Sequence, residues 1–264
     1  MYDFTYHRPA TIDAAAALVA AHDDFKVLAG GMSLIPTLKL RLARLSGVVD
    51  LRGVDTLKGI RREGDNIVIG AMTTHATVAG SNGIAKTIPA LTILAGGIGD
   101  PLVRNCGTIG GSIANADPAA DYPAAVVGLD AEIRTNRRKI AGAEFFRGLF
   151  ETGLQPGEII VAVSFPIPEV AAYAKLRQPA SRFALVGVLV AKSAAGVRVA
   201  VTGAGPAVFR WKDAEAALER SFDAPALDGI EMSADGLNSD IHASAEYRAH
   251  CVRIMAKRAV IAAR

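Results

Sequence analysis

Ala29-Gly30-Gly31-Met32-Ser33 and Thr108-Ile109-Gly110-Gly111-Ser112 are two glycine-rich stretches that lie far apart in this chain of 264 residues. We expect each stretch to present consecutive backbone N–H groups, because glycine has no side chain to block a close approach. Runs of main-chain donors of this kind bind phosphate and pyrophosphate groups. Two such loops predict a dinucleotide that is held from two sides rather than a lone phosphate.

The composition is that of a folded protein without a strong charge bias. Hydrophobic residues make up 51% of the chain and charged residues 21%, and the formal net charge is +3. A nucleic-acid-binding surface needs clustered basic residues with interleaved aromatic side chains, whereas Lys and Arg are scattered through this sequence. We therefore expect no nucleic-acid partner.

Other segments bear on location and redox state. The most apolar uncharged run, residues 87–99, is interrupted by Pro and Gly and is too short to cross a bilayer. Residues 1–4 lack the basic and apolar regions of a secretion signal. Cys106 and Cys251 are too few to hold an iron–sulfur cluster by thiolates alone, and a disulfide between them stays open. We expect a cytoplasmic protein without a membrane span.

Residue periodicity predicts a mixture of helices and strands. Helices are expected at 12–19 with Thr11 as its cap, from a cap at Thr73 or Thr74 through Val78, and at 88–95, 212–220 and 244–263. Strands are expected at 27–29, 48–51, 66–69, 131–135, 158–165, 183–191 and 197–202. The last helix should bury one face made of Tyr247, Cys251, Ile254, Met255 and Val260. Residues 98–121 are so rich in Gly, Asn, Asp and Pro that we expect no regular element of any length there. The pattern changes after residues 166–170, which predicts two domains, 1–170 and 171–264.

The first glycine-rich stretch follows a short apolar strand, and Ser33 can cap a helix that begins after it. That order of elements is typical of anion binding at a helix start. No Lys follows the glycines, which excludes the nucleoside-triphosphate P-loop. A simple tight turn is the alternative interpretation of this stretch taken alone.

Polar residues flank and follow the second stretch. Thr108 and Ser112 border its glycines, and Asn115, Asp117 and Asp121 come next. Acidic side chains near a pyrophosphate loop commonly bind the hydroxyl groups of a sugar or ribityl chain. In the alternative reading, Asp117 starts a turn and Asp121 caps the next element. We favour the turn for Asp117 and the ligand role for Asp121.

The remaining motifs carry little chemistry. Gly203-x-Gly205 follows a strand, but Pro206 and Val208 break the dinucleotide fingerprint, so a turn is expected. No histidine has metal-ligand spacing and no catalytic triad is visible, so we predict neither metal-binding nor catalytic residues. Arg104-Asn105 either orients the second stretch or faces a partner. The five histidines, for which surface or packing roles are expected, are His7, His22, His75, His242 and His250.

Longer blocks around these loops resemble a known family. They are Gly30-Gly31-Met32-Ser33-Leu34-Ile35-Pro36 with Lys39-x-Arg41-Leu42, then Ile98-Gly99-Asp100-x-x-Val103-Arg104-Asn105-x-Gly107-Thr108-Ile109-Gly110-Gly111-Ser112, then Ala116-Asp117-Pro118-Ala119-Ala120-Asp121. Together they resemble the FAD-binding medium subunit of molybdenum hydroxylases, a family that includes the carbon monoxide dehydrogenase medium subunit and the flavin domain of xanthine dehydrogenase. The similarity continues through Phe145-Phe146, Gly157-Glu158-Ile159 and Gly203-x-Gly205-Pro206, and so covers nearly the whole chain.

The resemblance implies an α+β fold. Its first part would be a two-subdomain FAD-binding domain of the vanillyl-alcohol-oxidase (PCMH) type, followed by a small C-terminal α+β domain. Both glycine loops would hold the FAD pyrophosphate, Ile98 and Ile160 would lie near the ring systems, and Lys175 would lie close to the flavin. The FAD-binding residues that it implies are Lys26, Val27, Leu28, Ala29, Gly30, Gly31, Met32, Ser33, Leu34, Ile98, Thr108, Ile109, Gly110, Gly111, Ser112, Ala114, Asn115, Asp117, Asp121, Ile160 and Lys175.

Some positions depart from the family pattern. Met32 replaces a polar residue, often His, and Cys106 occupies a position that usually holds another residue type. The cysteine-rich insertion of the acyl-CoA-reducing relatives is absent, which argues against that branch.

In function, the resemblance implies an oxidoreductase subunit that relays electrons through FAD. A small [2Fe–2S] subunit would supply the electrons, a large molybdopterin-binding subunit would hydroxylate the substrate, and an external acceptor would receive an electron pair. The chain would then be part of a hetero-oligomer, with no residue of its own acting on the organic substrate. The alternatives are a self-sufficient FAD oxidase or reductase and a non-catalytic nucleotide-binding or assembly module.

Overall fold

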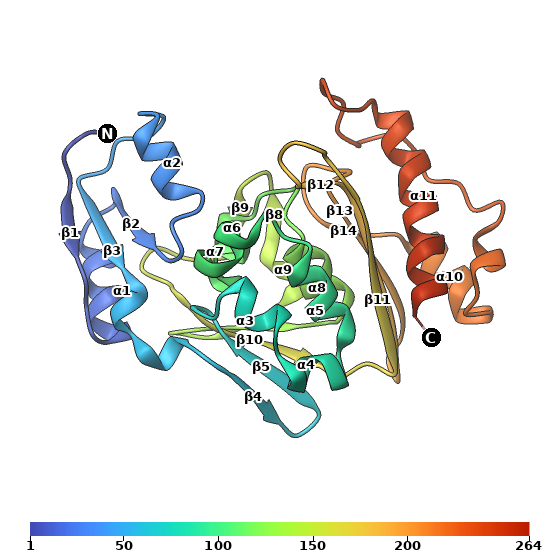
Figure 1. The fold of residues 1–264 in the computed structure, drawn as a ribbon, viewed down its shortest axis with the longest axis horizontal. Coiled ribbons are helices and arrows are strands. Elements are labelled where there is room, and N and C mark those ends of the chain that lie inside the picture. Colours follow the sequence, from blue (N-terminus) through green and yellow to red (C-terminus); the bar gives the residue numbers. More distant parts are fainter. Residues whose placement is uncertain (264) are drawn as a thin grey trace.

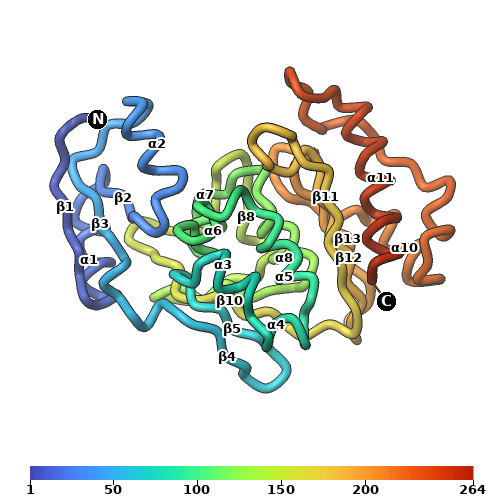
Figure 2. Tube along the Cα trace, in the orientation of Figure 1, coloured from blue at the N-terminus to red at the C-terminus, as the bar shows by residue number. Residues whose placement is uncertain are grey.

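The computed structural model describes residues 1–263. Figure 1 shows, in a row, an N-terminal sheet with its helices, a central sheet covered by helices, and a C-terminal sheet with helices on its outer side. The tube in Figure 2 shows that helices α1 (Ile12–Ala21) and α11 (Ala245–Ala262) lie at opposite ends of this row. The α+β fold expected from the sequence is confirmed. Within residues 1–263, no helix is long and apolar enough to cross a membrane.

The N-terminal unit is a parallel sheet with helical crossovers. Its strands β1 (Thr5–His7), β3 (Gly47–Asp50) and β2 (Phe25–Leu28) pair in that order. Helix α1 (Ile12–Ala21) begins where Thr11 Oγ1 accepts the N–H of Ala14 at 3.2 Å, as its sequence predicts. Helix α2 (Leu34–Lys39) follows β2, and two short 3-10 turns, η1 (Leu51–Gly53) and η2 (Asp55–Leu57), follow β3. The first glycine-rich stretch is therefore the connection from β2 to α2.

The central unit is an antiparallel sheet with helices on one side (Figure 1). The strands in spatial order are β4 (Ile60–Glu63), β5 (Asn66–Gly70), β10 (Ile160–Pro166), β6 (Glu132–Thr135) and β7 (Lys139–Ala141). The helices are α3 (His75–Ala79), α4 (Asn82–Thr87), α5 (Pro89–Gly96), α6 (Pro101–Cys106), α7 (Ile109–Asn115), α8 (Tyr122–Gly128) and α9 (Gly142–Phe145). A small hairpin, β8 (Phe146–Gly148) with β9 (Glu151–Thr152), completes the unit.

The expectation that residues 98–121 lack regular structure is wrong, because this segment contains α6 and α7. Asp100 caps α6 by accepting the N–H of Val103 at 2.9 Å, and Pro101 occupies the first helical position, where its missing N–H costs nothing. Thr108 caps α7 in the same way, and Ala116 ends it in a left-handed conformation with φ of 46°. Local caps thus outweigh the glycine content.

The C-terminal unit is a sheet that is buried on both faces. Its antiparallel strands are β11 (Val170–Arg177), β12 (Ala184–Ser193), β13 (Gly196–Thr202) and β14 (Phe209–Arg210). Leu189 and Ala200 pack with the helices of the central unit, and Val188 and Val199 pack under α10 (Lys212–Arg220) and α11 (Ala245–Ala262). A 3-10 turn, η3 (Ala224–Leu227), links these two helices.

The buried face of α11 differs from the expected one. Cys251, Met255 and Val260 are buried as predicted, but Tyr247 is 49% exposed, whereas its neighbour Arg248 is only 3% exposed. The guanidinium of Arg248 makes three hydrogen bonds inside the unit, so Arg248 rather than Tyr247 lies on the buried side of the first part of the helix.

His75 opens α3 from a buried position beneath the second glycine-rich stretch. Its backbone N–H donates to the Gly107 carbonyl at 2.9 Å, and the centroids of its ring and the Tyr122 ring are 5.4 Å apart. Burial, helped by the charge of Arg104, lowers the pKa of His75 to about 4 from an ordinary 6.5. Between those two pH values the unfolded chain binds a proton that the folded chain does not bind.

We therefore predict that stability rises with pH across this window and is lost as the pH falls from about 6.5 towards 4. The loss due to His75 should reach roughly 2 kcal/mol at pH 5. Urea unfolding of wild type and His75→Leu at pH 7 and pH 5 measures this loss. The unfolding free energy of His75→Leu should change less between the two pH values than that of wild type. Val78→Ala, a destabilising control at a buried position of the same helix, should keep the wild-type difference. An unchanged pH dependence in His75→Leu would contradict the prediction.

Candidate functional site

The two glycine-rich stretches meet in the structure, main chain against main chain. A Cβ atom on Gly30 would stand 2.1 Å from the carbonyl oxygen of Cys106 and 2.7 Å from the Cα of Gly107. A Cβ on Gly111 would stand 3.2 Å from that of Ala29. Gly30 is therefore required by this contact, since any side chain would force the loops apart.

The first stretch presents free main-chain donors. Within residues 1–263, no hydrogen bond is formed by the N–H groups from Gly30 to Leu34. Ser33 stands at the N-cap of α2 without a side-chain hydrogen bond, and Gly31 has a φ of 75°, which favours glycine. Free N–H groups at the start of a helix attract anions. Met32, in the middle of this run, is 42% exposed.

The second stretch differs from the expectation, because most of its donors are already used. The N–H groups of Ile109 and Gly110 donate to the carbonyls of Thr73 and Ala71 at 3.1 and 2.9 Å. The N–H of Gly111 donates to Thr108 Oγ1 at 3.2 Å. These bonds form because residues 109–115 coil into α7, whose first turn lies on residues 71–74. The second stretch is thus a rigid wall, and the first supplies the open donors.

The acidic residues after the second stretch have different environments. Asp117 is half-buried, and its Oδ1 accepts the N–H of Ala119 at 2.9 Å, which is the turn geometry favoured by the sequence. Burial raises the pKa of Asp117. Asp121 is buried and does not cap α8 with its side chain.

Asp121 instead joins a buried polar cluster with β11. Its carboxylate accepts the Tyr173 hydroxyl at 2.5 Å and the Lys175 ammonium at 2.8 Å. The side chains of the ion pair are 4% and 6% exposed, and Lys175 also donates to the Gly97 carbonyl at 3.2 Å. Burial raises the pKa of Asp121, while Lys175 and Tyr173 act in the opposite direction. The structure therefore brings together two predicted site residues that are distant in sequence.

The other predicted residues are more dispersed. Ala114 is exposed and Asn115 half-buried at the end of α7, and Lys26 is exposed on β2. Ile98 is partly buried against the central core cluster, to which the 4% exposed Ile160 belongs. Which of these residues touch a ligand stays a prediction.

Sequence reasoning missed Tyr173. Tyr173 and Lys175 lie on the same face of one strand, two residues apart, and that spacing could have indicated a shared partner. Arg104 binds the turn that precedes α6 rather than the second stretch itself, so both of its alternatives stay predictions. Its Nη1 donates to the carbonyls of Ile98 and Gly99 at 2.9 and 3.1 Å.

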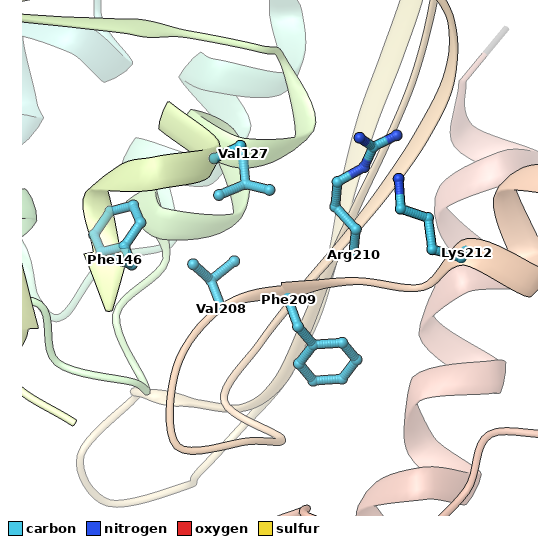
Figure 3. A pocket seen from close by; sticks show the side chains of 7 residues that line it. Val127, Phe146, Val208, Phe209, Arg210 and Lys212 are labelled. Atoms are coloured by element: carbon cyan, nitrogen blue, oxygen red, sulfur yellow. The ribbon is translucent and has the colours of Figure 1, made fainter. Parts of the chain in front are cut away.

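A separate pocket of about 300 Å³ lies between the central and C-terminal units (Figure 3). In Figure 3 the side chains of Arg210 and Lys212 extend in the same direction. Both cations bind Glu215, Arg210 through two contacts at 2.6 and 2.7 Å, so the pocket offers no open charge. Its lining residues are Val127, Ala143, Phe146, Val208, Phe209, Arg210 and Lys212, none of which is a predicted site residue. Within residues 1–263, no group of three or more His, Cys, Asp or Glu side chains is placed to hold a metal ion.

Comparison with known proteins identifies the family. Residues 2–168 match the family described as the FAD binding domain in molybdopterin dehydrogenase. The chain is 35% identical to the carbon monoxide dehydrogenase medium chain of Afipia carboxidovorans, over 97% of this chain and 95% of the relative. It is 36% identical to the nicotine 6-hydroxylase medium subunit of Paenarthrobacter nicotinovorans, over 98% and 96% of the two chains.

Solved structures agree along the whole length. A chain of carbon monoxide dehydrogenase from Oligotropha carboxidovorans matches with a TM-score of 0.90 and 35% identity, covering 99% of this chain and 98% of that one. A chain of quinoline 2-oxidoreductase from Pseudomonas putida 86 matches with a TM-score of 0.89 and 29% identity, over 99% and 97% of the two chains. Since sequence and fold agree from end to end, this chain belongs to the FAD-binding medium subunits of the molybdenum hydroxylases, a family of oxidoreductase subunits.

Proposed function

We propose that this chain is the FAD-binding, electron-transferring subunit of a molybdenum-containing hydroxylase or dehydrogenase. The observation that carries the proposal is the junction of the two glycine loops. There the N–H groups from Gly30 to Leu34 have no partner in the described residues, and the loops meet so closely that a Cβ on Gly30 would stand 2.1 Å from the Cys106 carbonyl oxygen. Open donors beside a main-chain contact without side chains suit a pyrophosphate group.

Each part of this region has a proposed role. The stretch Lys26–Leu34 would bind the pyrophosphate through main-chain donors, and the wall Thr108–Ser112 would close it from the other side. Asp117 and Asp121 would face the sugar or ribityl hydroxyls, and Ala114 and Asn115 would line the cofactor from the end of α7. Ile98 and Ile160 would lie towards the ring systems, as the resemblance implies.

Lys175 is proposed to lie at the flavin end of the site. Asp121 and the Gly97 carbonyl fix the Lys175 ammonium. Because the carboxylate offsets much of the positive charge, Lys175 would act as an oriented N–H donor more than as a free cation. When bound, FAD would supply electron exchange between an iron–sulfur donor and an external acceptor. The chain's own residues would bind and orient it, with no acid–base role towards an organic substrate.

The proposed assembly contains a large molybdopterin-binding subunit and a small [2Fe–2S] subunit. Names of relatives as medium chain and medium subunit support this. We further propose that residues 1–170 form a PCMH-type FAD-binding domain of two subdomains, and residues 171–264 a C-terminal domain. The family match over residues 2–168 and the start of β11 at Val170 support that division. The cytoplasmic location expected from the sequence stays a prediction.

Gly111→Asp should yield folded protein that lacks FAD. The new side chain would stand between the loops, near Ala29 and Thr108, and would place a negative charge where the pyrophosphate is proposed to bind. Flavin absorbance per folded chain, bleached by dithionite in the wild type, measures the effect. Gly83→Asp, on α4 with no atom closer than 3.8 Å to the added Cβ, is the control and should stay yellow. Full FAD content in Gly111→Asp would refute the assigned site.

Asp121→Ala should weaken FAD binding and destabilise the fold, because it leaves the buried Lys175 ammonium without its carboxylate. Breaking a buried ion pair in this way costs about 3–5 kcal/mol. Adding Lys175→Met removes the unpaired charge, so the double variant should recover stability without recovering FAD affinity. Urea unfolding and FAD titration separate the two effects. Wild-type FAD affinity in both variants would show that the Asp121–Lys175 ion pair stabilises the fold without contributing to FAD binding.

The assembly can be tested by capturing a tagged chain from the source organism. The purified material should contain one larger protein carrying molybdenum and one small protein carrying iron, in fixed ratio to FAD. An untagged extract treated identically is the control. A chain that is isolated alone and turns over a substrate would instead support a self-sufficient oxidase or reductase.

A further inference from the structure

Arg248 is a buried cation on α11 that has no part in the site proposed so far. Its side chain is 4% exposed, and its Nη2 donates to Asp240 at 2.7 Å. Its Nη1 donates to two main-chain carbonyls, of Leu185 at 2.8 Å and of Gly203 at 2.9 Å. Burying a guanidinium is costly unless its donors are used. Both Nη groups of Arg248 are hydrogen-bonded, whereas its buried Nε has no partner within residues 1–263. These bonds therefore tie α11 to the ends of two adjacent strands, β12 and β13.

The same strand ends hold the segment between Asp117 and Asp121. The N–H of Gly203 donates to the Pro118 carbonyl at 2.8 Å, while the carbonyl of the same residue accepts from Arg248. The three carbonyls between the two aspartates all accept bonds from this end of the sheet. The bonds are Gly203 N to Pro118 O, Ala184 N to Ala119 O at 3.1 Å, and Thr202 Oγ1 to Pro118 O at 2.9 Å and to Ala120 O at 2.7 Å.

Gly203 connects Arg248 to this acidic segment, because its carbonyl accepts from Arg248 and its N–H donates to Pro118. Its φ is 81°, and a Cβ there would stand 2.5 Å from the Ala184 carbonyl oxygen and 2.9 Å from that of Leu185. Position 203 therefore requires glycine for two reasons, its backbone conformation and the close approach of the neighbouring carbonyls. This explains Gly203 within the Gly203-x-Gly205-Pro206 motif, which the sequence alone assigned to a turn.

We propose that Arg248 is a positioning residue of the cofactor site. By fixing the ends of β12 and β13, its guanidinium sets the backbone of residues 118–120 and thereby the places of the Asp117 and Asp121 carboxylates. The inference rests on the proposed FAD site, of which those carboxylates are part. It gives the C-terminal unit a role in binding FAD, in addition to the side chains of Tyr173 and Lys175 on β11.

The test compares two variants of α11 in the full-length chain stripped of FAD. Arg248→Met removes the bonds to both carbonyls, whereas Val252→Ala, fully buried one turn further on, only weakens packing. At a temperature where both variants are folded, Arg248→Met should lower the affinity for added FAD roughly tenfold, a size typical of coupling through a packed network. Val252→Ala should stay close to wild type. Equal affinities in the two variants would overturn the role of Arg248.

A double-mutant cycle distinguishes positioning from general stabilisation. Thr202→Val removes the hydroxyl that binds the Pro118 and Ala120 carbonyls. If Arg248 acts through the same strand end, Arg248→Met should reduce FAD affinity less in the Thr202→Val background than in wild type. Fully multiplicative losses would refute the inference.

Arg248→Lys and FAD uptake by the wild-type chain give two further tests. Arg248→Lys keeps a buried cation and should fall between wild type and Arg248→Met in affinity, and it serves if the Met variant does not fold. An affinity of Arg248→Lys no lower than that of Val252→Ala would then count against the inference. If the wild-type chain itself does not take up FAD, the proposed function fails first, which separates the two failures.

Discussion

The contact between Gly30 and the Cys106–Gly107 backbone is the constraint on which the site depends. Two main chains from different units approach so closely that no side chain fits between them. This contact joins the N-terminal parallel sheet to the helical layer of the central unit. It also leaves the N–H groups after Gly30 without partners inside the described chain. The same packing constraint that joins the units therefore leaves a row of open donors at their border.

The two glycine pairs look alike in sequence but have different structural roles. Gly30 and Gly31 allow close approach and a left-handed turn, whereas Gly110 packs on Ala71, where a Cβ would stand 2.6 Å from that of Ala71. The N–H groups of Ile109 and Gly110 are used to fix α7 on residues 71–74. Because hydrogen bonds already fix the second stretch, less conformational freedom is lost on anion binding than if two flexible loops had to be ordered.

Local signals in the sequence predicted much of the fold, and tertiary contacts explain what they did not predict. Capping residues predicted helix starts at Thr11 and Thr74, and periodicity predicted a helix over Lys212–Arg220. The structure has all three features at these positions. Residues 98–121 were misjudged because the caps Asp100 and Thr108 outweigh glycine content. Tyr247 was misplaced because Arg248, a residue that periodicity would put outside, finds its hydrogen-bond partners in the interior. The cluster of Asp121, Tyr173 and Lys175 joins distant segments, so no local pattern could assemble it.

The proposed boundary near residue 170 divides the sequence into two parts, but the proposed site draws on residues from both. Before it lie both glycine loops and the acidic segment; after it lie the side chains that bind the Asp121 carboxylate and the strand ends that bind the carbonyls of residues 118–120. An isolated first domain would lose the ammonium and hydroxyl partners of the Asp121 carboxylate, and it would expose the central core that packs against Tyr173, Leu189 and Ala200. The C-terminal unit is thus better understood as the second half of the scaffold that orders the site than as an appendage to a complete domain.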